Sequence, residues 1–350
     1  MNSICVILLR AWVFFMWNVQ QFIDYIRGKR GAFIPITDLR IVHCLDGLLV
    51  VDKSHELLIN STHPWRNYVT LQMQVREMSQ LSSVFRLANF TLEHMYRFIH
   101  RLDASTSGLI CIAYSPKMAG LAAKAFQNRN TTKLYLAVVW GHVKDSTCLD
   151  VARLPKSDYL SSLNIDPSWC VGVCTKIGDM KYLVDFAIGD LHFSWPEGRC
   201  QKIMAPGCAS NCQRPRSAQT KITVLKHGFL EGSPASLLLL EPHSGRRHQL
   251  RLHCALGLRG HPIAGDLIYG RLYGDKELVE VAKDHSLPRL MLHAYSLHLE
   301  LVPKPPPVKG KKKQERVNRA HPRPLEFHFQ SSRNMLEGCQ WVDAAVFHSL

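Results

Sequence analysis

The sequence predicts an α+β fold, with flanking helices around a mixed, largely antiparallel sheet. Two apolar runs, 41–42 and 48–51, flank Asp46-Gly47, a dipeptide typical of the tight turn in a β-hairpin. Further apolar runs have the length of strands rather than of helices. Helical patterns occur among these runs without a regular strand–helix alternation, which favours α+β over a doubly wound sheet.

The elements after the hairpin follow from their apolar patterns. Residues 108–114 (GLICIAY) form a continuous apolar run, typical of a buried strand. Residues 117–128 combine alanines with spaced apolar residues, as an amphipathic helix does. The remaining predicted strands are 132–140, 220–226, 236–240 and 291–301, and a second helix is predicted over 247–256.

The length of 350 residues fits about two domains, or one catalytic unit with tails. We divide the chain into an N-terminal extension (1–37), a catalytic domain (38–303) and a basic, Pro-rich C-terminal tail (304–350). Within the catalytic domain, residues 155–219 are rich in turn formers, prolines and cysteines. They are predicted to be an irregular, variable insert.

The N-terminal extension contains an apolar stretch, 4–19, that is interrupted by Arg10. The stretch is short for a membrane span, and it lacks the charged start and the cleavage site of a secretory signal. A mitochondrial presequence, a docked helix and an incorrect start of the gene all remain as interpretations of this segment.

The formal net charge of +15 predicts an anionic partner, either nucleic acid or a membrane surface. The segment 304–323 alone holds eight basic residues and one acid. A moderately basic body with a strongly basic arm favours nucleic acid, although basic tails also serve solubility.

The eleven cysteines are odd in number and scattered, which does not indicate a disulfide framework. We therefore predict a reducing intracellular compartment, cytoplasmic or mitochondrial. Cys170/Cys174 and Cys208/Cys212 have a spacing that a zinc site tolerates. Ordinary free thiols are the favoured interpretation, and we expect no metal.

One candidate for chemistry is Asp103, in the sequence HRLDASTSG at 100–108. It lies between a basic pair and a hydroxyl-rich turn, directly before a predicted buried strand. Arg101 and nearby donors would favour the ionised carboxylate, which can attack carbon and form a covalent intermediate. An aspartate that caps a turn is the alternative from the local pattern alone.

A second candidate lies at 244–253 (SGRRHQLRLH). Arg247 and Arg251 are four residues apart and share a face if the segment is helical. Unpaired arginines on one face bind carboxylates or phosphates, often in bidentate fashion. A solvated basic face is the alternative.

Residues 100–108 resemble the signature of the RluA family of pseudouridine synthases, His-Arg-Leu-Asp followed by Thr-Ser-Gly. Three further blocks resemble those of the family and follow in the same order: 133–141 (KLYLAVVWG), 245–253 (GRRHQLRLH), and 260–270 (GHPIAGDLIYG) with 292–294 (LHA). The similarity runs over about residues 40–301. The sequence departs from the family at 52–56, where DKSHE replaces Asn-Lys-Pro-x-Gly, and at Arg247, where Thr is common.

The resemblance implies the pseudouridine synthase fold and the isomerisation of uridine in RNA. It implies that Asp103 is the nucleophile, that Tyr135 stacks on the target base, and that Arg251 pairs with the catalytic carboxylate. Leu292 is implied to pack beneath the base ring. Arg101 is implied to contact RNA and to occupy the space of the extruded nucleotide.

Lys133 and Arg246 are expected to contact phosphates of the RNA. The reaction is a redox-neutral rearrangement, so the resemblance implies neither a cofactor nor a metal. The expected partner is RNA, either tRNA, rRNA or mRNA, with no membrane partner indicated, and we expect a monomer.

Two alternatives differ from this interpretation. A retaining glycosidase also uses a carboxylate nucleophile at an anomeric carbon, but it needs a second carboxylate, and we assign none in these blocks. A catalytically inactive RNA-binding protein on the same fold would be indicated by the loss of Asp103, Tyr135 or Arg251, and all three are present.

Overall fold

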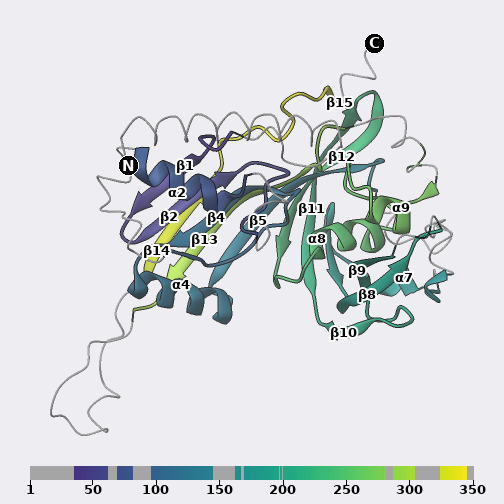
Figure 1. Cartoon of the computed structure of the whole chain (residues 1–350). Helices are drawn as coiled ribbons and strands as arrows, with labels where there is room; N and C mark the ends of the chain where they lie inside the picture. Colours follow the sequence, from purple (N-terminus) through teal and green to yellow (C-terminus); the bar gives the residue numbers. More distant parts are fainter. Residues whose placement is uncertain are drawn as a thin grey trace, which may run out of the picture. The chain divides into compact units, whose positions relative to one another are not determined.

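Figure 1 shows the computed structural model of the chain. The structure describes residues 35–61, 69–81, 96–144, 162–166, 169–196, 198, 200–276, 278, 280, 287–303 and 324–344. The chain forms two compact units, Met1–Met118 and Ala119–Leu350. Residues 1–34 of the N-terminal extension and the whole basic segment 304–323 lie outside the described residues.

The first unit contains a small antiparallel sheet in which β4 pairs with both β2 and β3, and β2 also pairs with β1. Asp46 and Gly47 both adopt positive φ in the turn between β1 and β2, which confirms the predicted hairpin. Every residue of β2 and β4 is buried, as their apolar runs predict. The bounds in this unit are β1 (Arg40–Leu45), β2 (Leu48–Lys53), α2 (Leu71–Leu81), β3 (Arg97–Phe98) and β4 (Ser107–Ala113).

The predicted helix after β4 is confirmed as α4 (Pro116–Asn128). Its N-terminus has a proline at the first helical position, where no intrahelical N–H bond is lost. The Ser115 hydroxyl caps it by accepting the Met118 N–H at 3.2 Å. The helix ends at Arg129, whose φ of 62° lies in the left-handed region typical of a helix C-terminus.

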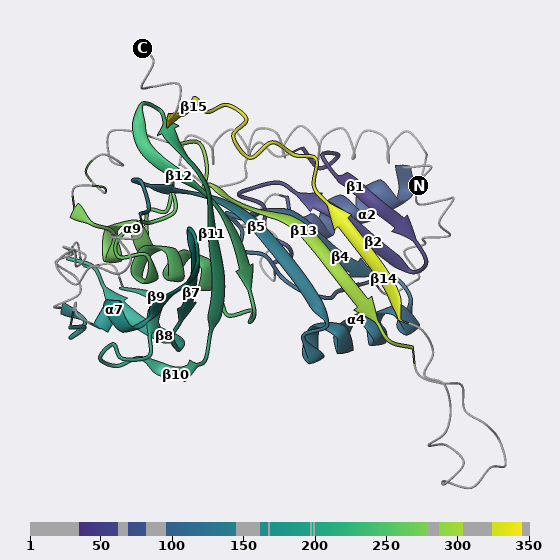
Figure 2. The ribbon, with the colours of Figure 1, turned by 180° about the vertical axis from the view of Figure 1, so that it is seen from behind.

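The second unit is organised around an antiparallel sheet in the order β13-β5-β12-β11-β7-β6. β14 pairs with β13, as Figure 2 shows from behind, and β15 pairs with β11. The strands are β5 (Thr131–Trp140), β6 (Cys174–Gly178), β7 (Lys181–Asp185), β11 (Gln219–Leu230), β12 (Ser233–Pro242), β13 (Leu292–Leu301), β14 (Leu325–Gln330) and β15 (Trp341–Asp343). Strands β5, β11, β12 and β13 confirm the predicted strands.

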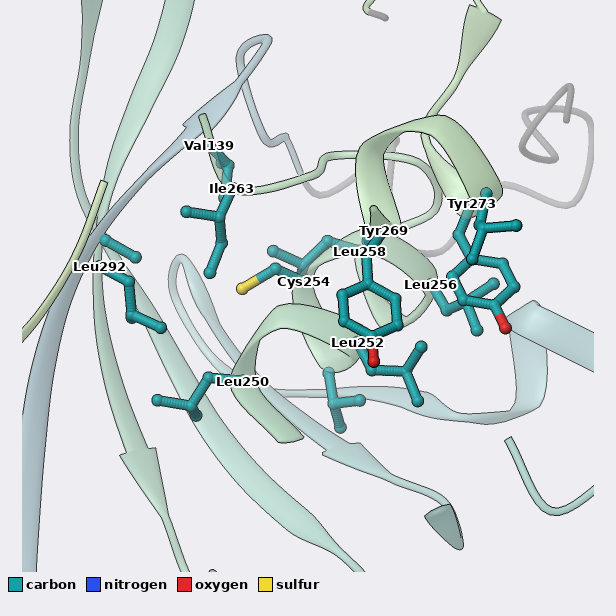
Figure 3. Close-up of a cluster of buried hydrophobic side chains, with 14 of the residues drawn as sticks. Val139, Leu250, Leu252, Cys254, Leu256, Leu258, Ile263, Tyr269, Tyr273 and Leu292 are labelled. Carbon is teal, nitrogen blue, oxygen red and sulfur yellow. The ribbon is translucent and has the colours of Figure 1, made fainter. Parts of the chain in front are cut away.

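A second sheet in this unit has three strands in the order β10-β8-β9. Its strands are β8 (Ile188–Ser194), β9 (Cys200–Pro206) and β10 (Gln213–Arg216). The short helices of the unit are α7 (Trp169–Gly172), α8 (Gln249–Leu252) and α9 (Tyr269–Tyr273), and a π-helix, η1 (His253–Gly257), follows α8 directly. Figure 3 shows the apolar side chains of α8, η1 and α9 in one buried cluster with Val139, Ile263 and Leu292.

The prediction that residues 155–219 are irregular is wrong in the described part of this segment. It contains the strands β6 to β10. These strands are short, and several alternate buried with exposed side chains: in β7, Tyr182 and Val184 are buried while Lys181 and Asp185 are exposed. Dense turn signals between such short strands obscured the period of two. The strands β14 and β15 were likewise not predicted.

Within the described residues, no group of three or more His, Cys, Asp or Glu side chains is arranged to hold a metal ion. The side chain of Cys170, one of the four cysteines weighed as zinc ligands, lies outside them. None of the helices that the structure describes is both long and apolar enough to span a bilayer.

The packing of η1 on β7 generates a prediction about stability. A Cβ atom on Gly257 would overlap Cγ1 of Val184, which is fully buried. We therefore expect Gly257→Ala to lower the free energy of unfolding by about 1–3 kcal/mol, because the core cannot accept the added volume. Denaturant unfolding measures this change.

Gly120→Ala is the matched control, because Gly120 lies in α4 with nothing within 4 Å of its added Cβ. This substitution should raise stability by up to about 1 kcal/mol through helix propensity. Equal stabilities of the two variants would contradict the packing at Gly257.

Candidate active site

Asp103 lies in a turn of the first unit between β3 and β4. The Ile99 N–H donates to the Cys111 carbonyl at 3.1 Å, and the Cys111 N–H donates to Nε2 of His100 at 3.0 Å. The Thr106 N–H donates to the backbone carbonyl of Asp103 at 3.2 Å. The buried strand β4 therefore holds the residues that precede the turn, and the turn, in which the Asp103 side chain is partly exposed, runs directly into β4.

Lys53 fixes the middle of the same turn. Its side chain is 1% exposed, and its Nζ donates to the carbonyls of Ala104 at 3.0 Å, Leu57 at 2.8 Å and Ser54 at 2.9 Å. A buried ammonium needs this set of acceptors, because burial removes its water. Lys53 thus connects the end of β2 to the residue that follows Asp103. Lys53 was not among the predicted site residues, although a lysine at the end of an apolar strand is a usable signal.

Arg251, on α8, forms a buried bidentate ion pair with Asp266. Its Nε donates to Oδ2 and its Nη2 donates to Oδ1, both at 2.7 Å. Its guanidinium also lies over the Tyr269 ring, 4.9 Å from the centroid. Asp103 belongs to the other unit, so its predicted pairing with Arg251 stays a prediction.

Asp266 is therefore a second carboxylate in the motif blocks, and the statement that these blocks contain none is wrong. Burial alone would raise its pKa, but Arg251 and the backbone N–H groups of Ile268 and Tyr269 hold that pKa below its usual value. A carboxylate that stays ionised and accepts these bonds is poorly suited to act as a general acid. The glycosidase alternative therefore gains no support from it.

The segment before α8 differs from its prediction. The helix begins at Gln249 rather than at residue 247, because His248 adopts a φ of 54°. Arg247 therefore precedes the helix and is exposed, whereas Arg251 is buried, so the two do not share a helix face. The buried Gln249 accepts the Arg246 N–H at 3.0 Å and donates to the Gln219 carbonyl at 2.9 Å, which anchors the turn to β11.

Tyr269 connects this site to the second sheet. Its hydroxyl accepts the Met204 backbone N–H of β9 at 3.0 Å and lies 2.7 Å from Nδ1 of His248. The Tyr269 hydroxyl therefore joins β9 to the turn before α8 through two hydrogen bonds.

Tyr135 and Leu292 lie on neighbouring strands of the second unit. Tyr135 is opposite Ala294, and Leu292 is opposite Ala137. Directly opposed residues share a face, as do alternate residues along a strand. The two side chains therefore lie on the same face of the sheet, two register positions apart, with Leu292 buried and Tyr135 partly exposed. Figure 3 shows Leu292 in one cluster with Leu250, which directly precedes Arg251.

The structure brings Lys133 and Arg246 together in the lining of one cavity of about 530 Å³ in the second unit. Both are partly buried, and burial lowers the pKa of Lys133. Burial is also the main cause that lowers the pKa of Arg246, followed by the charges of Arg216 and Arg129. Arg101 is exposed in the first unit.

Comparisons with known proteins identify the family. The sequence profile of the RNA pseudouridylate synthase family matches residues 47–256, which include the Asp103 turn and α8. The chain belongs to this family. It is 35% identical over 262 residues to RNA pseudouridylate synthase domain-containing protein 1 of Mus musculus, covering 75% of this chain and 68% of the relative. It is 28% identical to tRNA pseudouridine synthase C of Haemophilus ducreyi, covering 75% of this chain and 85% of that protein.

A solved structure agrees with this assignment. The structure of human RNA pseudouridylate synthase domain-containing 1 matches with a TM-score of 0.51 and 30% identity, over 78% of this chain and 86% of that one. The chain is thus an RNA pseudouridine synthase of the RluA type, an isomerase whose substrate is RNA.

The burial of the Arg251–Asp266 pair leads to a prediction about the free energy of unfolding. We expect Asp266→Asn to lower the free energy of unfolding by about 3–5 kcal/mol at neutral pH, because Arg251 is left buried without a full counter-charge. Asp190→Asn is the control. Its partners Lys202 and Arg214 are 40% and 75% exposed, so its loss should cost less than about 1 kcal/mol.

The pH dependence of the same variant has a defined sign. The pKa of Asp266 is lower in the folded state, so the pair contributes fully above the usual carboxyl pKa of 3.8 and the contribution disappears as pH falls through the folded value. Denaturant unfolding of the wild type and of Asp266→Asn gives the difference between their free energies of unfolding. This difference should be constant near neutral pH and shrink only below pH 3.8. A difference that grows as pH falls would contradict this assignment.

Proposed function

We propose that Asp103 is the nucleophile with which this synthase isomerises uridine in RNA, and that Arg251 keeps the carboxylate ionised and oriented. The observation that carries the proposal is the bidentate pair of Arg251 with Asp266. The pair fixes the position and direction of a guanidinium, and this group, with five N–H donors, can bind more than one carboxylate.

The proposed reaction balances without any external reagent. The N1–C1′ bond breaks, the uracil turns, and a C5–C1′ bond forms. C5 loses its proton and N1 gains one, so no electrons are exchanged. An ionised Asp103 serves each route to this outcome, whether it attacks ribose C1′, attacks uracil C6 or removes the C2′ proton. Any bond to Asp103 breaks again before the product leaves.

Tyr135 and Leu292 are the proposed contacts of the target base. Their shared face of the sheet suits a flat ring, with Tyr135 stacking on it and Leu292 beneath it. Tyr135 also carries a hydroxyl with which to help move the C5 proton. Arg101 is proposed to occupy the space that the extruded nucleotide leaves in the RNA.

The RNA class is left open among tRNA, rRNA and mRNA, and the protein is proposed to act as a monomer. We place it in a reducing intracellular compartment, cytoplasm or mitochondrion, because the described cysteines are free thiols. A catalytically inactive RNA-binding protein is the alternative function, and the following experiment separates the two.

We expect Asp103→Asn to abolish pseudouridine formation while fold and RNA binding stay nearly intact. Asparagine keeps the size of aspartate, but its neutral amide is a very poor nucleophile. The assay is uridine conversion in RNA from cells that lack the protein, with melting and RNA binding measured in parallel. Asp46→Asn is the matched control, since Asp46 lies in the exposed β1–β2 turn of the same unit and should leave conversion unchanged.

Two results would contradict the proposal. If Asp103→Asn retained activity within about tenfold of the wild type, a barrier change of only ~1.4 kcal/mol, Asp103 would not be the nucleophile. If the wild type bound RNA but converted no uridine, the binding-protein alternative would hold.

A further inference from the structure

Four basic side chains of the second unit lie close together, and no ion pair within the described part of the chain involves them. Lys202 and Arg214 pair with Asp190, Lys221 pairs with Glu241, and Lys226 pairs with Asp343. The ion pairs found among the described residues include none with Arg129, Lys133, Arg216 or Arg246. These four residues are called the basic track below.

The basic track is continuous in space. Arg129, Lys133 and Arg246 line the same cavity of about 530 Å³. The Nζ atom of Lys133 lies 3.8 Å from the position that a Cβ on Gly245 would take, so the ammonium lies directly beside the turn that carries Arg246. Arg246 donates from Nε to the Ser217 carbonyl at 3.0 Å, which holds it next to Arg216 at the end of β10.

Like charges held this close repel one another. Arg246 shows the effect, since the charges of Arg216 and Arg129 add to burial in lowering its pKa. This repulsion lowers the stability of the free protein, and the negative charges of a bound polyanion offset it. An arginine close by in the sequence does have an acidic partner, since Arg214, two residues before Arg216, pairs with Asp190.

We propose that the basic track binds consecutive phosphates of the RNA strand that carries the target uridine, with Lys133 on the phosphate nearest the reacting nucleotide. The inference rests on the proposed function. Lys133 and Tyr135 are alternate residues of β5 and so lie on one face of the strand. A strand whose base stacks on Tyr135 would therefore have its backbone beside Lys133.

The track also assigns a role to the second sheet. Arg216 belongs to β10, the strand whose four residues are all exposed. A guanidinium there can bind a phosphate in bidentate fashion, whereas Lys133 acts as a point charge inside the cavity. The insert would then extend the RNA contact beyond the cavity in the direction of Arg216.

Arg216→Gln and Arg214→Gln form a matched pair that tests the track. The two arginines lie on one exposed strand and lose the same charge, but Asp190 already pairs with Arg214 at 2.8 Å. The probe is a fluorescent oligouridylate, whose affinity for the full chain is measured by anisotropy at several salt concentrations. Melting temperatures are compared in parallel, and we expect Arg216→Gln not to lower them, because it relieves repulsion.

We expect Arg216→Gln to weaken binding about three- to tenfold at low salt and to reduce the salt slope by about 0.7 for the lost phosphate contact. Lys133→Gln and Arg246→Gln should weaken binding in the same way as Arg216→Gln. The affinity of Arg214→Gln should stay within about twofold of that of the wild type. Equal losses of affinity from Arg214→Gln and Arg216→Gln would mean that the protein binds RNA through diffuse charge, which would overturn the basic track. A wild type that does not bind the probe would overturn it as well.

The same measurement separates this inference from the proposed function. A wild type that binds oligouridylate with the expected pattern of variants, but forms no pseudouridine in cellular RNA, supports the track and contradicts the role of Asp103. Pseudouridine formation that persists while Arg216→Gln binds like the wild type overturns the track alone.

Discussion

The bidentate ion pair between Arg251 and Asp266 is the constraint on which the arrangement of α8 and α9 in the second unit depends. Both groups are buried, so each would be costly without the other. Asp266 also accepts the N–H groups of Ile268 and Tyr269 at the start of α9. One carboxylate therefore fixes the direction of the guanidinium and the beginning of a helix. The Tyr269 ring below the guanidinium completes the support.

The first unit holds Asp103 by different means. Hydrogen bonds of Ile99 and His100 to Cys111 of β4 hold the residues before its turn, and the ammonium of Lys53 fixes the middle through three carbonyls. Neither arrangement uses the carboxylate itself. These bonds position the proposed nucleophile through the backbone around it, and covalent catalysis requires such a fixed position.

Several parts of the fold could be predicted because their signals are local. The continuous apolar run of β4 and the Asp46-Gly47 turn each determine an element without help from distant residues. Other features depend on contacts that spacing cannot reveal. Asp266 lies within a motif block, but its pairing with Arg251 depends on how the chain folds between the two residues. The late start of α8 depends on the positive φ of His248 and on the anchoring of Gln249 to β11. The roles of Tyr135 and Leu292 follow from the resemblance alone, and for Asp103 the resemblance favours the nucleophile over the turn-capping alternative.

The central claim, that Arg251 serves Asp103 as well as Asp266, is tested most directly by a double-mutant cycle on the free energy of unfolding. Asp103→Asn and Arg251→Gln are measured singly and together, so that the loss suffered by Asp266 enters both arms and cancels. Direct pairing predicts that the two effects are not additive, with a coupling of at least about 1 kcal/mol. Additive effects within about 0.5 kcal/mol would contradict the account.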